Sequence, residues 1–291
     1  HIGMRFADYA GAQETLRAAR LEALDHLVGI ANAEDCSLLV VAGDLFDRLT
    51  VSAGEVRQTA KILDGFQGEA AVLPGNHDFL PSGGCELWST FRRAAGPRTL
   101  LLEQRRPYPV DVGPLPVRLY AGPCDSKHSR DNAVGWVREA RQGEATAQPG
   151  PLRLGVAHGS LQGLSPDRQG EYFPMNPEEL TAAGLDFWIV GHTHRPWPAV
   201  DGDEQRVLVP GTPEPDGFDC VHGGSAWLLE AQTGRAPRRR LLATGRHRFL
   251  EEEISVAAAL DQRELLARYG DPDLARTLVR LRLRGRLSAE D

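Results

Sequence analysis

The chain has 291 residues, 41% of them apolar, and a formal net charge of -7 at pH 7. This composition suits a globular enzyme with one large core, and it excludes collagen-like and intrinsically disordered proteins. The negative charge disfavours a protein that coats nucleic acid unspecifically, because such binding depends on basic patches that release counterions.

The first eighty residues are expected to alternate helix and strand, as a crossover α/β unit does. Apolar residues at three-and-four spacing predict an amphipathic helix over Gln13–Ala33, and a second helix is expected over Ser52–Phe66. The apolar runs Leu38–Val41 and Ala70–Leu73 predict strands. Because these runs are continuous, both strands should be covered on both faces.

The middle of the chain continues this alternation after a helix that contains Leu87, Trp88 and Phe91 and a Pro-rich passage. Strands are expected at Val117–Ala121, Leu152–Val156 and Phe187–Val190, helices at Asn132–Arg141 and Pro177–Ala183, and hairpin-style strands at Val207–Val209 and Ala226–Leu229. The polar stretch 142–150 is expected to be a surface loop.

The pattern changes at about Arg248, after an Arg-rich segment. Strand, helix and strand are expected at Glu252–Val256, Gln262–Tyr269 and Thr277–Leu287. We therefore divide the chain into residues 1–247 and a partial second domain at 248–291, which we expect to be clipped at its C-terminus.

No run of apolar residues approaches the length of a membrane span, and the first twenty residues lack the layout of a secretory signal. We expect a cytoplasmic protein with no membrane partner. The four cysteines form no C-x-x-C pair and are expected to be buried small hydrophobes. Cys124 with His128, or Cys220 with His222, could ligate zinc, but nothing in their context favours it.

Four short polar signatures each follow an apolar run, which places them at the ends of buried strands, where open α/β sheets bind ligands. They are GDLFD at 43–47, GNHD at 75–78, AHG at 157–159 and GHTH at 191–194. Together these signatures predict a two-metal phosphoesterase site. Such sites hold two divalent cations about 3.5–4 Å apart and need a carboxylate that bridges them.

Individual residues in these signatures support the prediction unequally. Asp44 is the best candidate for the bridging ligand, although most Asp residues in such a GDxxD pentapeptide merely cap the next segment. Asn76 and His77 are adjacent and point differently, so one can bind metal while the other faces substrate, or the pair can be a plain turn. His158 alone carries little weight, whereas the H-x-H pair of His192 and His194 is a moderate metal signal.

The joint pattern is stronger than its parts, because five of the nine histidines occupy such positions: His1, His77, His158, His192 and His194. Mixed His, Asn and Asp ligands suit manganese or iron better than calcium. We therefore expect two divalent metal ions, with Mn²⁺ favoured.

The order of the four signatures resembles that of the calcineurin-like metallophosphoesterases. GDLFD, the segment 210–215 after the histidine pair and the trailing strand-helix-strand resemble the DNA-repair exonuclease branch, the SbcD and YhaO type of nuclease subunit. The resemblance implies an α/β fold, a two-sheet sandwich flanked by helices, with a partial capping domain after about Arg248.

The resemblance also implies roles for individual residues. Asp44 bridges the two metals, and His77, steadied by Asp78, protonates the leaving oxygen. The remaining ligands divide between the two ions: Asn76, His158 and His192 complete one, and His1 and His194 serve the other.

The chain departs from the family at its first motif, D-x-H, because it begins with His1-Ile2-Gly3 and matches only the end of that motif. His1 could be a tag remnant, but the Ile-Gly that follows fits the motif. We expect the natural protein to extend upstream, and one metal site of this chain to lack a carboxylate.

The implied activity is a manganese-dependent DNA phosphodiesterase, an exonuclease of DNA repair in which a metal-bridging hydroxide attacks phosphorus. A homodimer and an SbcC-like ATPase subunit are the implied partners. One alternative is a small-molecule phosphodiesterase or phosphomonoesterase on the same scaffold. Another is a catalytically impaired subunit that binds DNA or the ATPase.

Arginines cluster between Thr233 and Leu250 without an intervening acid. Arg238, Arg239 and Arg240 could lie along a DNA path, because each phosphate contact by a basic side chain contributes to affinity. The alternative is a strand with a solvated arginine face.

Overall fold

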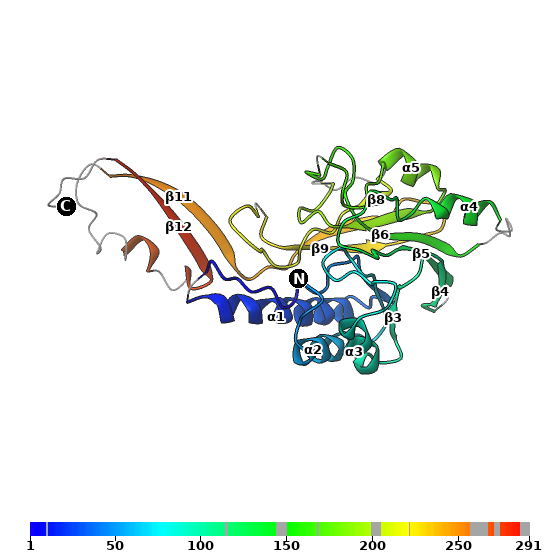
Figure 1. Ribbon diagram of the computed structural model, residues 1–291, viewed down its shortest axis with the longest axis horizontal. Helices are drawn as coiled ribbons and strands as arrows, with labels where there is room; N and C mark the ends of the chain where they lie inside the picture. Colours follow the sequence, from blue (N-terminus) through cyan, green and yellow to red (C-terminus); the bar gives the residue numbers. More distant parts are fainter. Residues whose placement is uncertain are drawn as a thin grey trace.

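The computed structural model describes residues 1–9, 11–113, 116–143, 150–167, 169–198, 205–220, 222–256, 267–270 and 274–285. Two sheets form its centre, with helices α1, α2 and α3 on one outer side and α4 and α5 on the other (Figure 1). This arrangement confirms the predicted α/β sandwich flanked by helices.

The first sheet has three parallel strands in the order β1-β2-β3, which are Leu38–Val41, Glu69–Val72 and Thr99–Leu101. The helices of this half are α1 (Gln13–Ala33), α2 (Ala53–Asp64) and α3 (Glu86–Ala94), as the sequence predicted apart from their exact ends. Ser52 caps α2, because its side-chain oxygen accepts a hydrogen bond from the backbone N–H of Glu55 at 3.2 Å.

The second sheet has five strands in the order β4-β5-β6-β7-β8. Strands β5 (Pro116–Gly122), β6 (Leu152–His158), β7 (Phe187–Gly191) and β8 (Val207–Leu208) run parallel, and β4 (Pro107–Asp111) joins the edge antiparallel to β5. Helices α4 (Trp136–Gln142) and α5 (Pro177–Ala182) cover the outer face.

Three apolar layers hold these elements together. The inner faces of both sheets share one cluster, in which Ala71 and Leu73 from the first sheet meet Leu119 and Val156 from the second. A second cluster lies under α4 and α5, and a third joins the first sheet to α2 and α3 around Trp88. The sandwich core therefore fixes the position of one sheet against the other, which decides where their strand ends meet.

Several sequence predictions need correction. Strands β3 and β4 were not predicted, and β4 contains Pro107 and Pro109, which a sheet tolerates because β4 is an edge strand. Helix α4 begins at Trp136 rather than at Asn132. The expected hairpin of residues 207–209 with 226–229 is wrong, because β8 pairs with β7.

Strand β9 (Ser225–Glu230) pairs antiparallel with β10 (Arg238–Ala243). Strands β11 (Arg248–Val256) and β12 (Thr277–Gly285) form a separate parallel pair that projects from the sandwich (Figure 1). The strands expected there are present, but the expected helix 262–269 lies mostly outside the described residues. The capping-domain boundary at Arg248 remains a prediction. Among the described helices, none is long and apolar enough to cross a membrane.

Gly155 provides a test of this packing. It lies beside Trp188 in the β6-β7 register, and a Cβ at this position would overlap the Trp188 indole, which donates a hydrogen bond to the Leu180 carbonyl at 2.7 Å. We predict that Gly155→Ala lowers the free energy of unfolding by about 1–3 kcal/mol, measured by urea denaturation.

Gly29→Ala is the matched control, because this helical position has no heavy atom within 4 Å of an added Cβ. It should stabilise the protein by up to about 1 kcal/mol, through helix propensity. Equal unfolding midpoints for Gly155→Ala and the parent would contradict the proposed overlap.

Candidate metal centre

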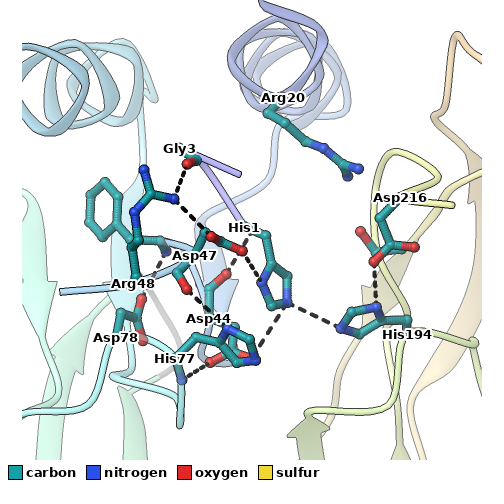
Figure 2. Close-up of polar contacts among 12 residues, drawn as sticks. His1, Gly3, Arg20, Asp44, Asp47, Arg48, His77, Asp78, His194 and Asp216 are labelled. Carbon is teal, nitrogen blue, oxygen red and sulfur yellow. Dashed lines mark hydrogen bonds and ion pairs between the residues drawn. The ribbon is translucent and has the colours of Figure 1, made fainter. Parts of the chain in front are cut away.

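The polar signatures converge at the carboxyl ends of strands from both sheets. Asp44 follows β1 and Asn76 follows β2, whereas His158 is the last residue of β6 and His192 follows β7. Because the two sheets face each other, loops that are far apart in the sequence meet above one edge of the sandwich. Figure 2 shows part of this cluster, with His1, Asp44, His77 and His194 around one centre.

The backbone at these strand ends adopts conformations that few residues accept. Gly43 has φ +91° and Asp44 has φ +53°, which turns the chain sharply out of β1 and aims the Asp44 carboxylate inward. A Cβ on Gly43 would overlap the His158 ring, so only glycine allows these two loops to approach. His192 also has a positive φ, +94°, at the end of β7.

Asp44, Asn76, His158 and His192 form the first donor cluster. His158 Nε2 lies 3.2 Å from Asp44 Oδ2 and 3.0 Å from Asn76 Oδ1, and His192 Nδ1 lies 3.1 Å from the same amide oxygen. Asp44, Asn76 and His158 are all buried. The residues that the sequence grouped as one ligand set are therefore linked by contacts of hydrogen-bond length.

The donor chemistry of this cluster fits a cation. His158 Nδ1 lies 2.8 Å from the Ala42 carbonyl and donates to it, so Nε2 of the neutral ring has a lone pair. Nε2 faces two acceptor oxygens, so the cluster needs a positive charge, which either a proton on Nε2 or a cation between the three atoms supplies. Residues of mixed nitrogen and oxygen type suit manganese, iron or zinc.

The pKa values of the two imidazoles shift in opposite directions. Burial opposes protonation of His158, but the adjacent Asp44 carboxylate outweighs it and raises the pKa of His158 above its ordinary value. Burial, together with the neighbouring His158, lowers the pKa of His192 to about 4. His192 is therefore neutral at pH 7, which is the form that binds metal.

A second donor cluster surrounds His1. Its Nε2 lies 3.1 Å from His194 Nε2 and 3.5 Å from Asp44 Oδ2, and its Nδ1 lies 3.6 Å from Asp47 Oδ1 (Figure 2). His1, Asp47 and His77 place potential ligand atoms within 4.8 Å of one another. Asp44 Oδ2 thus faces histidines of both clusters, which is the position that a bridging ligand requires.

His77 is oriented differently from what the sequence suggested. Its backbone N–H donates to Asp44 Oδ1 at 2.9 Å, and its ring Nδ1 lies 3.0 Å from the Asp47 carbonyl. Asp78 does not steady the imidazole, because both of its carboxylate oxygens accept backbone N–H groups, from Phe46 at 2.9 Å and Gly75 at 2.6 Å. Asp78 instead ties the two signature loops together, and this corrects the expected Asp78–His77 contact.

Two carboxylates of the site were not identified from the sequence. Asp47 closes GDLFD and lies beside His1, so the signature itself contained the signal. Asp216 follows the segment 210–215, and its Oδ2 lies 2.6 Å from His194 Nδ1 (Figure 2). Burial disfavours ionised Asp216, but the hydrogen bond with His194 outweighs it and lowers the pKa of Asp216 to about 2. Its only sequence signal was its proximity to the histidine pair.

The three arginines suggested for DNA binding lie on β10, outside this cluster of donors. Side chains alternate along a strand, so Arg238 and Arg240 share one face and Arg239 has the other. Arg240 forms an ion pair with Glu34 at 2.6 Å, and the Arg239 guanidinium lies over the Trp227 ring at 5.8 Å. These arginines therefore do not share one face, and their role in DNA binding stays a prediction.

Comparison with known proteins gives a consistent family assignment. The family model for calcineurin-like phosphoesterases matches residues 15–196. The uncharacterized metallophosphoesterase YhaO of Bacillus subtilis (strain 168) is 21% identical over 204 residues, which is 67% of this chain and 46% of YhaO. The chain thus spans about half the length of that relative.

Two solved structures from Thermus thermophilus are also similar. The protein TT1561 is 15% identical with a TM-score of 0.44, covering 66% of this chain and 84% of TT1561. The sulfate thiohydrolase SoxB, in complex with glycerol, is 14% identical with a TM-score of 0.41, covering 78% of this chain and 42% of SoxB.

The Asp216–His194 contact generates a prediction about metal affinity. A carboxylate that accepts a hydrogen bond from the ring N–H of a ligand imidazole fixes the tautomer and the direction of the ring. Asp216→Asn should weaken binding of one Mn²⁺ by about 10- to 100-fold, measured by calorimetric titration, and leave the other ion bound as in the parent. Loss of both ions together, or of neither, would show that Asp216 does not act through His194.

Proposed function

The chain belongs to the calcineurin-like phosphoesterase family, and we propose that this metal-dependent phosphoester hydrolase acts on DNA as an exonuclease. The observation that carries the proposed chemistry is the Asp44 carboxylate, which faces His158 at 3.2 Å and His1 at 3.5 Å from two separate donor clusters. One carboxylate between two imidazole groups is the arrangement that a pair of divalent ions needs.

The residues divide into two ligand sets around Asp44. We assign Asn76, His158 and His192 to one ion, and His1 and His194 to the other. Asp47 adds a carboxylate to this set, with its Oδ1 3.6 Å from His1 Nδ1. When bound, divalent ions lower the pKa of coordinated water and neutralise the charge that develops on the phosphate.

We assign His77 the role of general acid. Its ring Nδ1 donates a hydrogen bond to the Asp47 carbonyl, and its backbone N–H donates one to the Asp44 carboxylate. Both the ring and the backbone of His77 are therefore held in place. Because Nδ1–H donates to the Asp47 carbonyl, only the doubly protonated ring carries a further proton on Nε2; that proton would pass to the leaving oxygen of a substrate held at this centre and leave a neutral imidazole. Proton donation there neutralises the alkoxide as the P–O bond breaks.

The preference for DNA rests on the four signatures and on their resemblance to the exonuclease branch. The same resemblance supports manganese as the metal, a homodimer, and an SbcC-like ATPase as partner, all of which belong to the proposal. A small-molecule phosphodiesterase or phosphomonoesterase remains the second candidate, because divalent ions held by these residues would contact a phosphate irrespective of what it is attached to.

Turnover of matched substrates with Mn²⁺ tests the proposal. Single-stranded DNA, duplex DNA and a cyclic nucleotide are incubated with the protein at increasing Mn²⁺. We predict that DNA loses mononucleotides from an end, that the reaction requires metal, and that chelation abolishes it. Hydrolysis of the cyclic nucleotide alone would favour the small-molecule enzyme, and metal binding without hydrolysis of any substrate would favour a catalytically impaired subunit.

The role of His77 generates a separate prediction. His77→Ala should lower turnover by about 10²- to 10⁴-fold, because a positioned general acid contributes about that much, while Mn²⁺ affinity stays unchanged. Calorimetry and single-turnover kinetics measure the two quantities.

His26→Ala is the control, because His26 is an exposed histidine on α1 that makes no contact with the centre. Weaker metal binding by His77→Ala would instead identify His77 as a ligand, as its grouping with His1 and Asp47 permits.

A further inference from the structure

The segment 212–216 connects the metal centre to the root of β11. Thr212 lies beside the histidine pair, since its N–H donates to the His194 carbonyl at 3.0 Å. Glu214 follows between two prolines, Pro213 and Pro215, whose rings restrict the backbone. Asp216 then reaches back to His194 Nδ1. Both ends of the segment therefore contact His194, which is assigned above as a metal ligand.

Glu214 is buried in this segment, with 1% of its surface exposed. Its Oε1 accepts the backbone N–H and the ring Nδ1 of His247, at 2.8 and 2.9 Å, and its Oε2 accepts the Arg246 N–H at 2.8 Å. A buried carboxylate is stable only when such donors satisfy it. All three donors come from the two residues that precede β11.

Arg20 holds the other side of the segment. Its guanidinium extends from α1 and donates to the Glu214 carbonyl at 2.6 Å and the Pro215 carbonyl at 2.8 Å. Arg20 is itself buried, and its positive charge contributes to the low pKa of Asp216. In Figure 2 the Arg20 side chain reaches from its helix toward Asp216. The backbone on the N-terminal side of Asp216 is thus fixed from α1 and from the root of β11.

We infer that Glu214 is a positioning residue for the metal centre, which holds Asp216 where its carboxylate orients the His194 ring. Glu214 does not touch the metal ligands with its own carboxylate, so it acts only through Asp216. The same carboxylate anchors the start of β11, so one buried side chain holds both the root of the projecting strand pair and a metal ligand.

A double-mutant cycle on metal affinity tests this inference. Glu214→Gln keeps the size of the side chain but has one acceptor oxygen in place of two, so it cannot satisfy both the Arg246 and the His247 groups. We expect Glu214→Gln to weaken one Mn²⁺ by about 10-fold or more, as loss of an outer-shell partner does. In the double variant Glu214→Gln/Asp216→Asn, Mn²⁺ affinity should equal that of Asp216→Asn alone within about 2-fold, because both substitutions disrupt the same Asp216–His194 interaction.

Asp186→Asn is the matched control. Asp186 is also a buried carboxylate whose two oxygens accept backbone N–H groups, from Arg153 at 2.7 Å and Gly234 at 2.6 Å, but it lies at the opposite end of β7 from His192. It should lower thermal stability to a similar extent without changing Mn²⁺ affinity. An equal loss of affinity in Asp186→Asn would overturn the inference, because the loss would then follow from general destabilisation.

Arg20→Met offers a second variant in case Glu214→Gln does not fold. It keeps an unbranched apolar side chain at this position but removes the guanidinium, which lies over the Phe6 ring and donates to the Glu214 and Pro215 carbonyls. It should weaken the same Mn²⁺, again without effect in the Asp216→Asn background. The inference would be overturned if Arg20→Met or Glu214→Gln bound Mn²⁺ as tightly as the parent. It would also be overturned if either substitution further weakened Mn²⁺ binding when combined with Asp216→Asn.

The inference rests on the metal-dependent activity proposed above, but its readout is Mn²⁺ affinity and needs no substrate. Failure to cleave DNA would therefore leave it intact. A parent protein that binds no Mn²⁺ would overturn both the proposed function and the inference, whereas normal binding by the parent and by Glu214→Gln overturns the inference alone.

Discussion

The buried Asp44 carboxylate is the constraint on which the site depends. An ionised carboxylate that is removed from water must be paired, and here its partners are His158 of the second sheet and His1 at the start of the chain. Its pKa is held far below the ordinary range, because the charge of His158 outweighs the penalty of burial. The carboxylate can keep this environment only if the two sheets and the first residues of the chain stay in register with one another. The sandwich core, in which Leu73 packs with Val156, provides that rigidity.

The loops around Asp44 depend on specialised backbone for their geometry. Positive φ at Asp44 and His192 disfavours ordinary side chains, and hydrogen bonds elsewhere compensate for that strain. Asp78 joins the loops after β1 and β2, and the Ala42 carbonyl fixes the His158 ring. The His158 ring and the loops that carry Asp44 and Asn76 therefore have a second group behind them, and donors preorganised in this way lose little conformational entropy when a cation binds.

The β11-β12 pair contrasts with the rigid sandwich. Two strands alone are marginally stable in water, so other contacts must support them. On one face, Arg280 and Arg282 pair with Glu251, and Arg284 pairs with Glu253, but these ion pairs are exposed and each contributes little. At the root, the rings of Tyr9, Phe218 and Phe249 contact one another, with centroids 5.2–6.0 Å apart. The aromatic contacts and the buried Glu214 attach the pair to the body at the end nearest the metal centre.

The sequence by itself determined most of the secondary structure of the sandwich and most of the donor residues, because both are local patterns: apolar runs predict the strands, and Asp44, Asn76, His158, His192 and His194 follow those runs directly. It could not determine which strands pair, since β8 joins β7 rather than β9 and β9 joins β10, and Pro107 and Pro109 hid an edge strand. Nor could it assign Asp78, Asp47 or Asp216, because a carboxylate's role depends on which group it faces. The tertiary structure decided that Asp78 joins two loops and that Asp216 supports His194: the pairing of β1 with β2 brings Asp78 to the Phe46 loop, and the return of residues 212–216 to His194 brings Asp216 within hydrogen-bond distance of its ring.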